Sequence, residues 1–492
     1  MEDIKMKLAL LVANRGFFPS SVIDSAYAEM KSAFAKAEVE CLTFEEGKTK
    51  YNAVESTADG NLYHQFLAEH RGEYDGLVVC LPNFGDENGI KAALRGIDVP
   101  VLIQAYPDEL GKMDFEHRRD AFCGKFALTS VLTQMGVKYT DYTPFTVAPD
   151  TDGFVSELKK FAATCRVVKA LSGMRVGVIG ARTSAFKSVR YDETVLERHG
   201  VEVETYDLTA IISVYNKLSD DDASVQKWKE ELHAAADFGC APAGKDAVLA
   251  KFGAALESVI TTAKLDAIAI RCWSELQELL GITPCSILGL LNHKGIAAAC
   301  ETDVSNAVAM RALAAASGLS SGCLDLNNNY GDEENKCILF HCGPLPSELM
   351  ELPGEIQDHK MLSKGKAEKC SWGLNVGKVK PGEITICGMR ATNGELAFFS
   401  DKAVITSDPV DKEFFGVYGV TLKKITPIGG GKHLRLLFTK GENSFQALLF
   451  GISRGDFCFE EGDLLDAAVT AGINEYGGNR NVSVRIKALR IS

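Results

Sequence analysis

The sequence predicts an α/β protein with two doubly wound parallel-sheet domains followed by a C-terminal antiparallel β-barrel domain. Over the first two-thirds of the 492-residue chain, short continuous apolar runs alternate with amphipathic stretches. This alternation is typical of parallel sheets covered by helices on both faces, and it restarts near residue 172. From about residue 378, short strands with glycine-rich joints follow one another closely, as in a barrel. We therefore expect domains at 1–168, 169–345 and 346–492.

The first domain is expected to begin with the apolar strand KLALLVA at residues 7–13. A stretch with apolar residues at helical spacing follows at 21–35. Further strands are expected at 38–44, 76–81 and 100–104. These runs are continuous rather than alternating, which favours burial on both faces of a parallel sheet.

The second domain repeats this pattern, and the third changes it. Strands of the second sheet are expected at 175–179, 202–206, 267–270 and 297–300. In the third domain, strands are expected at 383–387, 395–399 and 421–425. The change from alternating strands and helices to closely spaced strands marks the change of fold class.

The net charge, the cysteines and the length of the apolar segments limit the classes of function that are possible. The net charge is −13, which argues against a chain that coats nucleic acid, although one basic module would escape this argument. The fourteen cysteines are scattered without any C-x-x-C pair, so we expect buried thiols in a reducing compartment and no zinc knuckle. The N-terminal apolar run is too short for a signal peptide, and no segment approaches the roughly 18 apolar residues of a membrane span. We expect a cytoplasmic protein without a membrane partner.

The highest density of polar residues comes directly after predicted strands of the second domain. Glu301 follows the run AAAC, Asp325 follows GCL, and His341 follows CILF. Ligands of open α/β sheets bind beyond the carboxyl ends of the strands, so these three side chains are candidates for one site. Two carboxylates and an imidazole suit a divalent cation. The alternative for each acid is a helix cap.

Other polar or aromatic residues at strand ends are candidates for substrate binding. The alternatives are a core or interface position for the tryptophan, Asx turns for the asparagines of the second domain, and a solvated loop for the arginine. The candidates are Trp273, Asn327, Asn328, Asn83, Glu87 and Arg182.

Over roughly residues 5–420 the sequence resembles the L-fucose isomerase family, which is related to L-arabinose isomerase. The motifs that carry this resemblance are RCWSE, ACETD, DLNNNYGDEE and ILFHC, in that order, with NFGDE in the first domain and FFGVYG at 414–419. The resemblance implies a manganese-dependent aldose–ketose isomerase. It places Glu301 and Asp325 as metal ligands and as the acid/base pair, and His341 as a histidine near the metal. It also implies a homo-oligomer, in which NFGDE contributes to a neighbouring subunit's site.

The chemistry implied by this resemblance is a proton transfer through a cis-enediol. Mn²⁺ or another divalent cation would polarise the carbonyl of the open-chain sugar. One carboxylate would move the proton between C2 and C1, and the other would shuttle the hydroxyl proton.

The C-terminal segment departs from this family. The family ends with a His-His-Val-type motif, whereas no histidine follows His433 here, and the nearest analogue is Arg480–Asn481. Residues 421–492, with INEYGGNR and SVRIKALRIS, instead resemble the oligonucleotide-binding-type domain of RecJ exonucleases. This segment has 10 Lys and Arg against 7 Asp and Glu, a balance that a single-strand-binding barrel tolerates. The exonuclease's Asp-His-His motif is absent, so nuclease activity is not implied.

Three functions remain open from the sequence. The first is an active metal-dependent isomerase acting on a sugar. The second is a catalytically lapsed sugar-binding or regulatory protein, because the terminal histidine is lost. The third is a fusion whose C-terminal module binds single-stranded nucleic acid.

Overall fold

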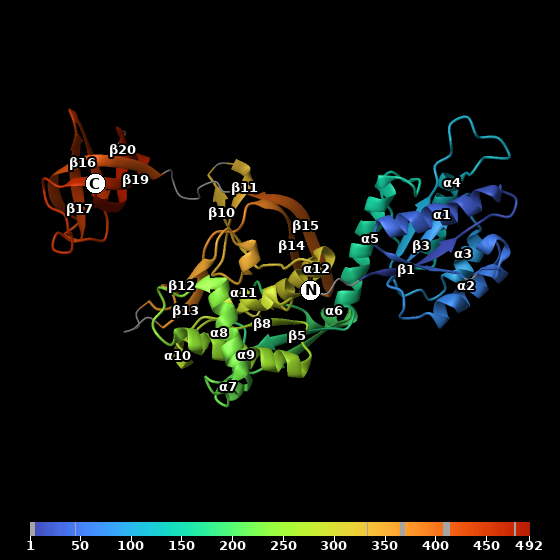
Figure 1. Ribbon diagram of the computed structural model, residues 1–492, viewed down its shortest axis with the longest axis horizontal. Coiled ribbons are helices and arrows are strands. Elements are labelled where there is room, and N and C mark those ends of the chain that lie inside the picture. The colour runs from blue at the N-terminus through green and yellow to red at the C-terminus, as the bar shows by residue number, and fades with distance from the viewer. Residues whose placement is uncertain (1–4, 45, 332, 365–369, 407–413, 477–478) are drawn as a thin grey trace. The chain divides into compact units, whose positions relative to one another are not determined.

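The computed structural model describes residues 5–44, 46–331, 333–364, 370–406, 414–476 and 479–492 (Figure 1). The chain divides into two compact units. The first comprises Met1–Asp325 and His341–Ile405, and the second comprises Leu326–Phe340 and Thr406–Ser492. Among the described residues, no helix is both long enough and apolar enough to cross a membrane.

The first sheet is parallel, with strand order β2-β1-β3-β4. Its side chains alternate between two buried clusters, because successive residues of a strand point to opposite faces. Leu8 and Leu10 pack with α1 and α5, whereas Ala9 and Leu11 face the cluster that contains side chains of α2, α3 and α4. Helices therefore cover both faces. The elements are β1 (Lys7–Val12), β2 (Glu40–Thr43), β3 (Gly76–Leu81), β4 (Val101–Ala105), α1 (Ser21–Lys36), α2 (Thr57–Glu69), α3 (Glu87–Ala93), α4 (Ala121–Gln134) and α5 (Asp152–Leu171).

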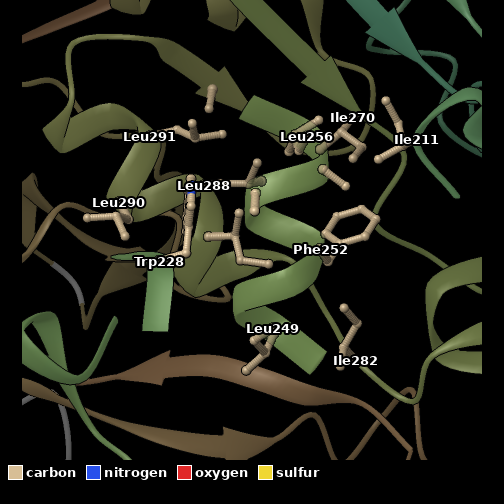
Figure 2. Packing of buried hydrophobic residues seen from close by; sticks show 14 of the residues in the cluster. Ile211, Trp228, Leu249, Phe252, Leu256, Ile270, Ile282, Leu288, Leu290 and Leu291 are labelled. Carbon is tan, nitrogen blue, oxygen red and sulfur yellow. The ribbon is translucent and has the colours of Figure 1, made fainter. Parts of the chain in front are cut away.

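The second sheet is also parallel, with strand order β6-β5-β8-β9. Helices α8, α9 and α11 contribute to the buried cluster on one face, and α6 and α12 to the cluster on the other. Figure 2 shows Phe252, Leu256, Ile270 and Leu288 gathered in the first of these clusters. The elements are β5 (Met174–Ile179), β6 (Val201–Tyr206), β8 (Ala267–Ile270), β9 (Ala297–Ala299), α6 (Glu193–Arg198), α8 (Ala223–Ala235), α9 (Lys245–Ala263), α11 (Cys285–His293) and α12 (Val304–Ser317).

Two smaller β structures complete the first unit. Strand β12 pairs with β13 antiparallel and with the short β7 in parallel. Strands β14 and β15 form a hairpin of their own, so the strands expected at 383–387 and 395–399 are not barrel strands. They are held by apolar contact instead, because Met389 and Ala391 are buried in a cluster with the second sheet. The bounds are β7 (Ala236–Asp237), β12 (Gly354–Asp358), β13 (Trp372–Val376), β14 (Gly382–Thr392), β15 (Glu395–Ile405), α7 (Leu208–Tyr215), α10 (Glu275–Leu279) and the 3₁₀ turns Lys50–Asn52 and Ser347–Leu349.

The second unit contains a closed barrel with strand order β16-β17-β18-β20-β19. The expected antiparallel arrangement holds for four neighbouring pairs, but β18 and β20 are parallel. Parity requires such an exception, because an odd number of strands cannot alternate direction all the way around a ring. The strands are β16 (Phe414–Ile428), β17 (His433–Lys440), β18 (Asn443–Leu449), β19 (Leu464–Tyr476) and β20 (Asn479–Ile491).

The segment between Asp325 and His341 differs from the prediction. CILF at 337–340 was expected to be a third apolar strand delivering His341 to the parallel sheet. It instead belongs to β11 (Glu333–Phe340), which forms a two-stranded sheet with β10 (Asp325–Tyr330). The physical reason is the polarity of this segment: nearly all its described side chains are exposed, and its acids and amides could not be buried between helices.

Candidate functional site

The candidate site lies at the carboxyl edge of the second sheet. Backbone hydrogen bonds continue the strands into this edge, from Arg271 N–H to the Ile179 carbonyl at 2.8 Å and from Thr302 N–H to the Ile270 carbonyl at 3.2 Å. The loops that follow β5, β8 and β9 are therefore neighbours. Glu301 lies on the third of these loops, as the sequence predicted.

The turn that carries Glu301 has an unusual backbone. Glu301 and Thr302 are both left-handed, with φ of 61° and 58°. Each such residue costs about 1 kcal/mol relative to the right-handed region. The turn ends at Asp303, whose carboxylate accepts a hydrogen bond from Asn306 N–H at 3.0 Å and caps α12. Asp303 is therefore the residue that caps the helix. The left-handed backbone at Glu301 supports a functional role for that residue.

Burial makes the Glu301 carboxyl a weak acid. It raises the pKa of Glu301 to about 7, with Asp325 adding to the rise and His341 opposing it. Desolvation disfavours the charged form, so the group titrates near neutral pH. Burial also raises the pKa of Asp303, and its hydrogen bonds to Asn306 oppose this shift.

His341 is nearly enclosed, with 4% of its side chain exposed. Its Nε2 lies 3.3 Å from Cys300 Sγ and 4.0 Å from Asp325 Oδ2. Its Nδ1 accepts a hydrogen bond from Cys342 N–H at 2.8 Å. Asp325, at the first position of β10, has 64% of its side chain exposed, so the pair joins a buried imidazole to a solvated carboxylate.

The surroundings of His341 favour two different charge states. Burial lowers the pKa of His341, but the thiols of Cys342 and Cys323 and the Asp325 carboxylate outweigh it and raise this pKa to about 9. The hydrogen bond from Cys342 N–H requires a neutral ring, because a backbone amide can only donate. The hydrogen bond from Cys342 N–H to Nδ1 places the proton of the neutral ring on Nε2.

The donor types around this site suit a divalent cation, but their arrangement does not complete a metal site. Among the residues that the structure describes, no three His, Cys, Asp or Glu side chains are grouped so that they could hold an ion. With its proton on Nε2, His341 presents no lone pair toward Asp325. The predicted ligand set of Glu301, Asp325 and His341 therefore stays a prediction.

Trp273 and Arg182 occupy neighbouring loops of the same edge. The Trp273 ring packs edge-on against Phe186, with ring centroids 4.8 Å apart. Arg182 Nη1 donates to the carbonyls of Thr183, Ser184 and Phe186, of which the shortest contact is 2.8 Å to Phe186. These contacts order the loop after β5 against the tryptophan. A role for either residue in substrate binding stays a prediction.

The two predicted asparagines of β10 belong to the second unit. Asn327 and Asn328 are exposed, and the Asn328 side-chain carbonyl accepts a hydrogen bond from Asn329 N–H at 2.9 Å. This contact joins adjacent residues and is not an Asx turn, which bonds the N–H two residues on, so a role of these asparagines in substrate binding stays a prediction.

Asn83 and Glu87 lie at the carboxyl edge of the first sheet. Asn83 is fully buried, and its amide donates to Asn14 Oδ1 at 2.6 Å and accepts from Arg15 N–H at 3.2 Å. Glu87 forms an ion pair with Arg15 at 3.0 Å, and the Arg15 guanidinium also stacks over Phe84. Both residues thus hold the loops of their own sheet together, and a contribution to another subunit's site stays a prediction.

Cysteines are the part of the site that the sequence reasoning missed. The sequence predicts that the cysteines are buried small hydrophobes, which holds for Cys80, but the Cys300 thiol and the Cys342 N–H directly contact His341. The signal was present in the motifs ACETD and ILFHC, where a cysteine adjoins a candidate residue. All fourteen cysteines are free thiols.

The fold defines an α/β protein joined to a five-stranded barrel. Residues 9–172 match the family model for the N-terminal domain of fucose/sulfoquinovose isomerases, and residues 411–488 match that for the RecJ OB domain. These matches confirm both resemblances over the matched residues, and of the isomerase motifs only NFGDE lies within 9–172.

Curated relatives support the first of these matches. Sulfoquinovose isomerase from Priestia aryabhattai is 27% identical over 199 residues, which cover 40% of this chain and 44% of that protein. Sulfoquinovose isomerase from Alkalicoccus urumqiensis is 26% identical over 285 residues, covering 56% and 61%. The chain thus spans about half the length of the relatives it matches. A crystal structure of RecJ from Thermus thermophilus is 10% identical, covers 99% of this chain and 69% of that chain, and has a TM-score of 0.15, which is too low to carry an argument.

Proposed function

We propose that the chain is an aldose–ketose isomerase whose proton transfers are carried by Glu301 and Asp325. The observation that carries the proposal is the electrostatic interaction of the Glu301 carboxyl with Asp325 and His341, whose Oδ2 and Nε2 lie 4.0 Å apart. The similarity to sulfoquinovose isomerases supports the same class of reaction.

Each residue has a role that follows from its surroundings. Glu301, with a pKa of about 7, can both accept and return a proton near neutral pH, as the transfer between C2 and C1 requires. Asp325 is solvated and can shuttle the hydroxyl proton. Nε2 of His341 lies 4.0 Å from this carboxylate, which is too far for a hydrogen bond, so their contact is electrostatic. The strained Glu301 backbone keeps the base at one position.

A requirement for Mn²⁺ or another divalent cation stays part of the proposal. No step above passes through a cation, because the described residues do not group into a ligand set. Elemental analysis of the purified chain, and activity with EDTA and then with added Mn²⁺, test the requirement. About one manganese per chain would support it, and full activity in EDTA would contradict it.

The experiment for the isomerase is proton exchange in D₂O. The chain is incubated with L-fucose, L-arabinose and sulfoquinovose, and ketose formation with deuterium at C1 is followed by NMR. We expect Glu301→Gln and Asp325→Asn each to lower kcat/KM by about 100-fold or more. The matched control is Glu351→Gln, an exposed acid whose backbone N–H bonds to Lys378. Sugar binding without conversion would support the lapsed, sugar-binding alternative.

A second candidate function rests on the barrel. Register places Arg435 of β17 opposite Leu448 of β18, and Leu448 opposite Arg485 of β20, so the two arginines flank one residue on neighbouring strands. Arg485 also lies over the half-exposed Phe450 ring, 5.6 Å from its centroid, and His433 packs against the same ring. We propose that this surface, Arg435, Phe450 and Arg485, binds single-stranded nucleic acid.

Positive charge and aromatic stacking would together bind a single strand at this surface. The arginines would contact phosphates, and a base would stack on Phe450, a contact of about 1–3 kcal/mol. The test is fluorescence anisotropy of a labelled single-stranded oligonucleotide over a range of salt concentrations. Arg435→Gln with Arg485→Gln should flatten the plot of log affinity against log salt by about 1.4, since each phosphate contact contributes about 0.7.

The matched control for this test is Arg454→Gln. Arg454 pairs with Glu460 outside the proposed surface, so its loss should leave the salt slope unchanged. Equal loss in both variants would show charge attraction without a defined surface. No binding at low salt would contradict this second function.

A further inference from the structure

We propose that Cys285 and Cys342 form an oxidation site, in which a peroxide converts the two thiols into a disulfide. The two thiols are hydrogen-bonded to each other, although they lie 57 positions apart in the chain. Cys342 is partly exposed, and Cys285 is buried at the first position of α11. One thiol can thus meet an oxidant while the other lies behind it.

The surrounding structure keeps the two thiols together. Helix α11 packs against the segment that follows Cys342: Asn292 Nδ2 donates to the Pro344 carbonyl at 3.2 Å, and a Cβ at Gly289 would lie 2.6 Å from the Leu345 carbonyl oxygen. This close approach requires glycine at position 289. The pairing therefore depends on packed backbone and not on two mobile side chains.

Polar neighbours assist each thiol. His359 Nε2 lies 3.6 Å from Cys342 Sγ, within reach of its proton, and Thr283 Oγ1 lies 3.3 Å from Cys285 Sγ. Both neighbours lie outside the trio of Glu301, Asp325 and His341.

The reaction balances with one hydrogen peroxide. Cys342 sulfur attacks one peroxide oxygen, the O–O bond breaks, and the product is a sulfenic acid, while the other oxygen leaves as water with the thiol proton. Cys285 sulfur then attacks Cys342 sulfur, an S–S bond forms, and the hydroxide leaves as water with the second thiol proton. Two thiols are oxidised and one peroxide is reduced to two waters.

Exposure distinguishes this pair from the other thiols nearby. Cys300 is hydrogen-bonded to Cys272 and Cys323, and all three are buried, so no member of that group meets an oxidant first. Cys342 is the more exposed member of its own pair. An inhibitory effect is expected because Cys342 N–H holds His341, and this consequence alone rests on the proposed isomerase.

The test uses the full chain, fully reduced and then treated with one equivalent of hydrogen peroxide. We expect the intact mass to fall by about 2 Da, a digest to yield one cross-linked peptide pair containing Cys285 and Cys342, and dithiothreitol to reverse both changes. The wild-type peptide map decides the pairing without any variant. A cross-link through another cysteine, or oxidation without a cross-link, would overturn the proposal.

Variants sharpen the test and separate it from the isomerase. Cys285→Ser should stop at the sulfenic acid, which dimedone traps on Cys342, and Cys342→Ser should abolish the loss of mass. Cys123→Ser, which removes an exposed thiol on α4, is the control and should leave the cross-link unchanged. Dimedone adducts on Cys123 alone would contradict the proposal. All readouts are masses, so they stand even if no isomerase activity is found.

Discussion

At the scale of single residues, Glu301 combines two unfavourable features. Its backbone is left-handed, and its carboxyl group is half removed from water. Neither feature stabilises the fold, and strain together with a shifted pKa is typical of a position kept for its chemistry. Both features can be measured without an assay for activity.

Glu301→Gln should therefore stabilise the metal-free protein at alkaline pH. The pKa of Glu301 is raised from 4.5 to about 7, so the folded chain binds this proton more tightly than the unfolded chain between those values. Wild-type stability falls as pH rises through this window and stays lower above it. Glutamine has no proton to release, and after allowance for solvent screening we expect the variant to be more stable by about 1–2 kcal/mol at pH 8.

The measurement is urea unfolding in EDTA below pH 4.5 and again at pH 8. Glu351→Gln is the control and should give the same difference from wild type at both pH values. A constant offset for Glu301→Gln would contradict a raised pKa in the folded protein.

At the scale of elements, α12 connects the strained turn to the sheet. Asp303 caps this helix by accepting from Asn306 N–H, and its Oδ2 also accepts from the Asn306 side chain at 3.0 Å. The cap holds the first turn of the helix directly after Glu301. The Asp303 side chain thus links the stability of α12 to the position of Glu301.

Asp303→Ala should lower the free energy of unfolding by about 1 kcal/mol, because a helix N–H loses its partner. Asp303→Asn should retain most of this stability, since asparagine caps as well as aspartate. Chemical denaturation of both variants measures the difference. Equal losses in the two would indicate that charge, and not capping, is what Asp303 supplies.

At the scale of the whole molecule, the chain contains separate cores. Phe252 is fully buried in the cluster beneath the second sheet, and Phe438 is fully buried in the cluster inside the barrel. The first belongs to the first compact unit and the second to the other. Each unit therefore has the apolar burial that cooperative unfolding requires.

Calorimetry of the full chain should show separate transitions for the two units. Phe438→Ala should lower only the barrel transition, and Phe252→Ala only a transition of the first unit, each by a loss of about 3–5 kcal/mol. The two variants serve as controls for each other. A shift of both transitions in either variant would contradict independent units.

Sequence pattern predicted the parts of this protein that depend on local chemistry. Both parallel sheets were predictable from continuous apolar runs such as GLVVCL at 76–81. A strand that is buried on both faces can be identified from its own residues, without knowledge of the strands beside it. The position of Glu301 at a strand end follows from the same pattern. The resemblances to both families also come from local sequence, and each is matched by a family model, over residues 9–172 and 411–488.

Tertiary structure decided everything that depends on long-range pairing. CILF has the apolar pattern of a buried strand, yet β11 pairs with β10 in a two-stranded sheet, since the polar residues before CILF exclude it from the parallel sheet. The contacts of His341 with Cys300 and of Cys342 with Cys285 join residues 41 and 57 positions apart. Local sequence determines what a segment can bury, whereas the packing of distant segments determines which side chains meet, and the chemistry of this site depends on that meeting.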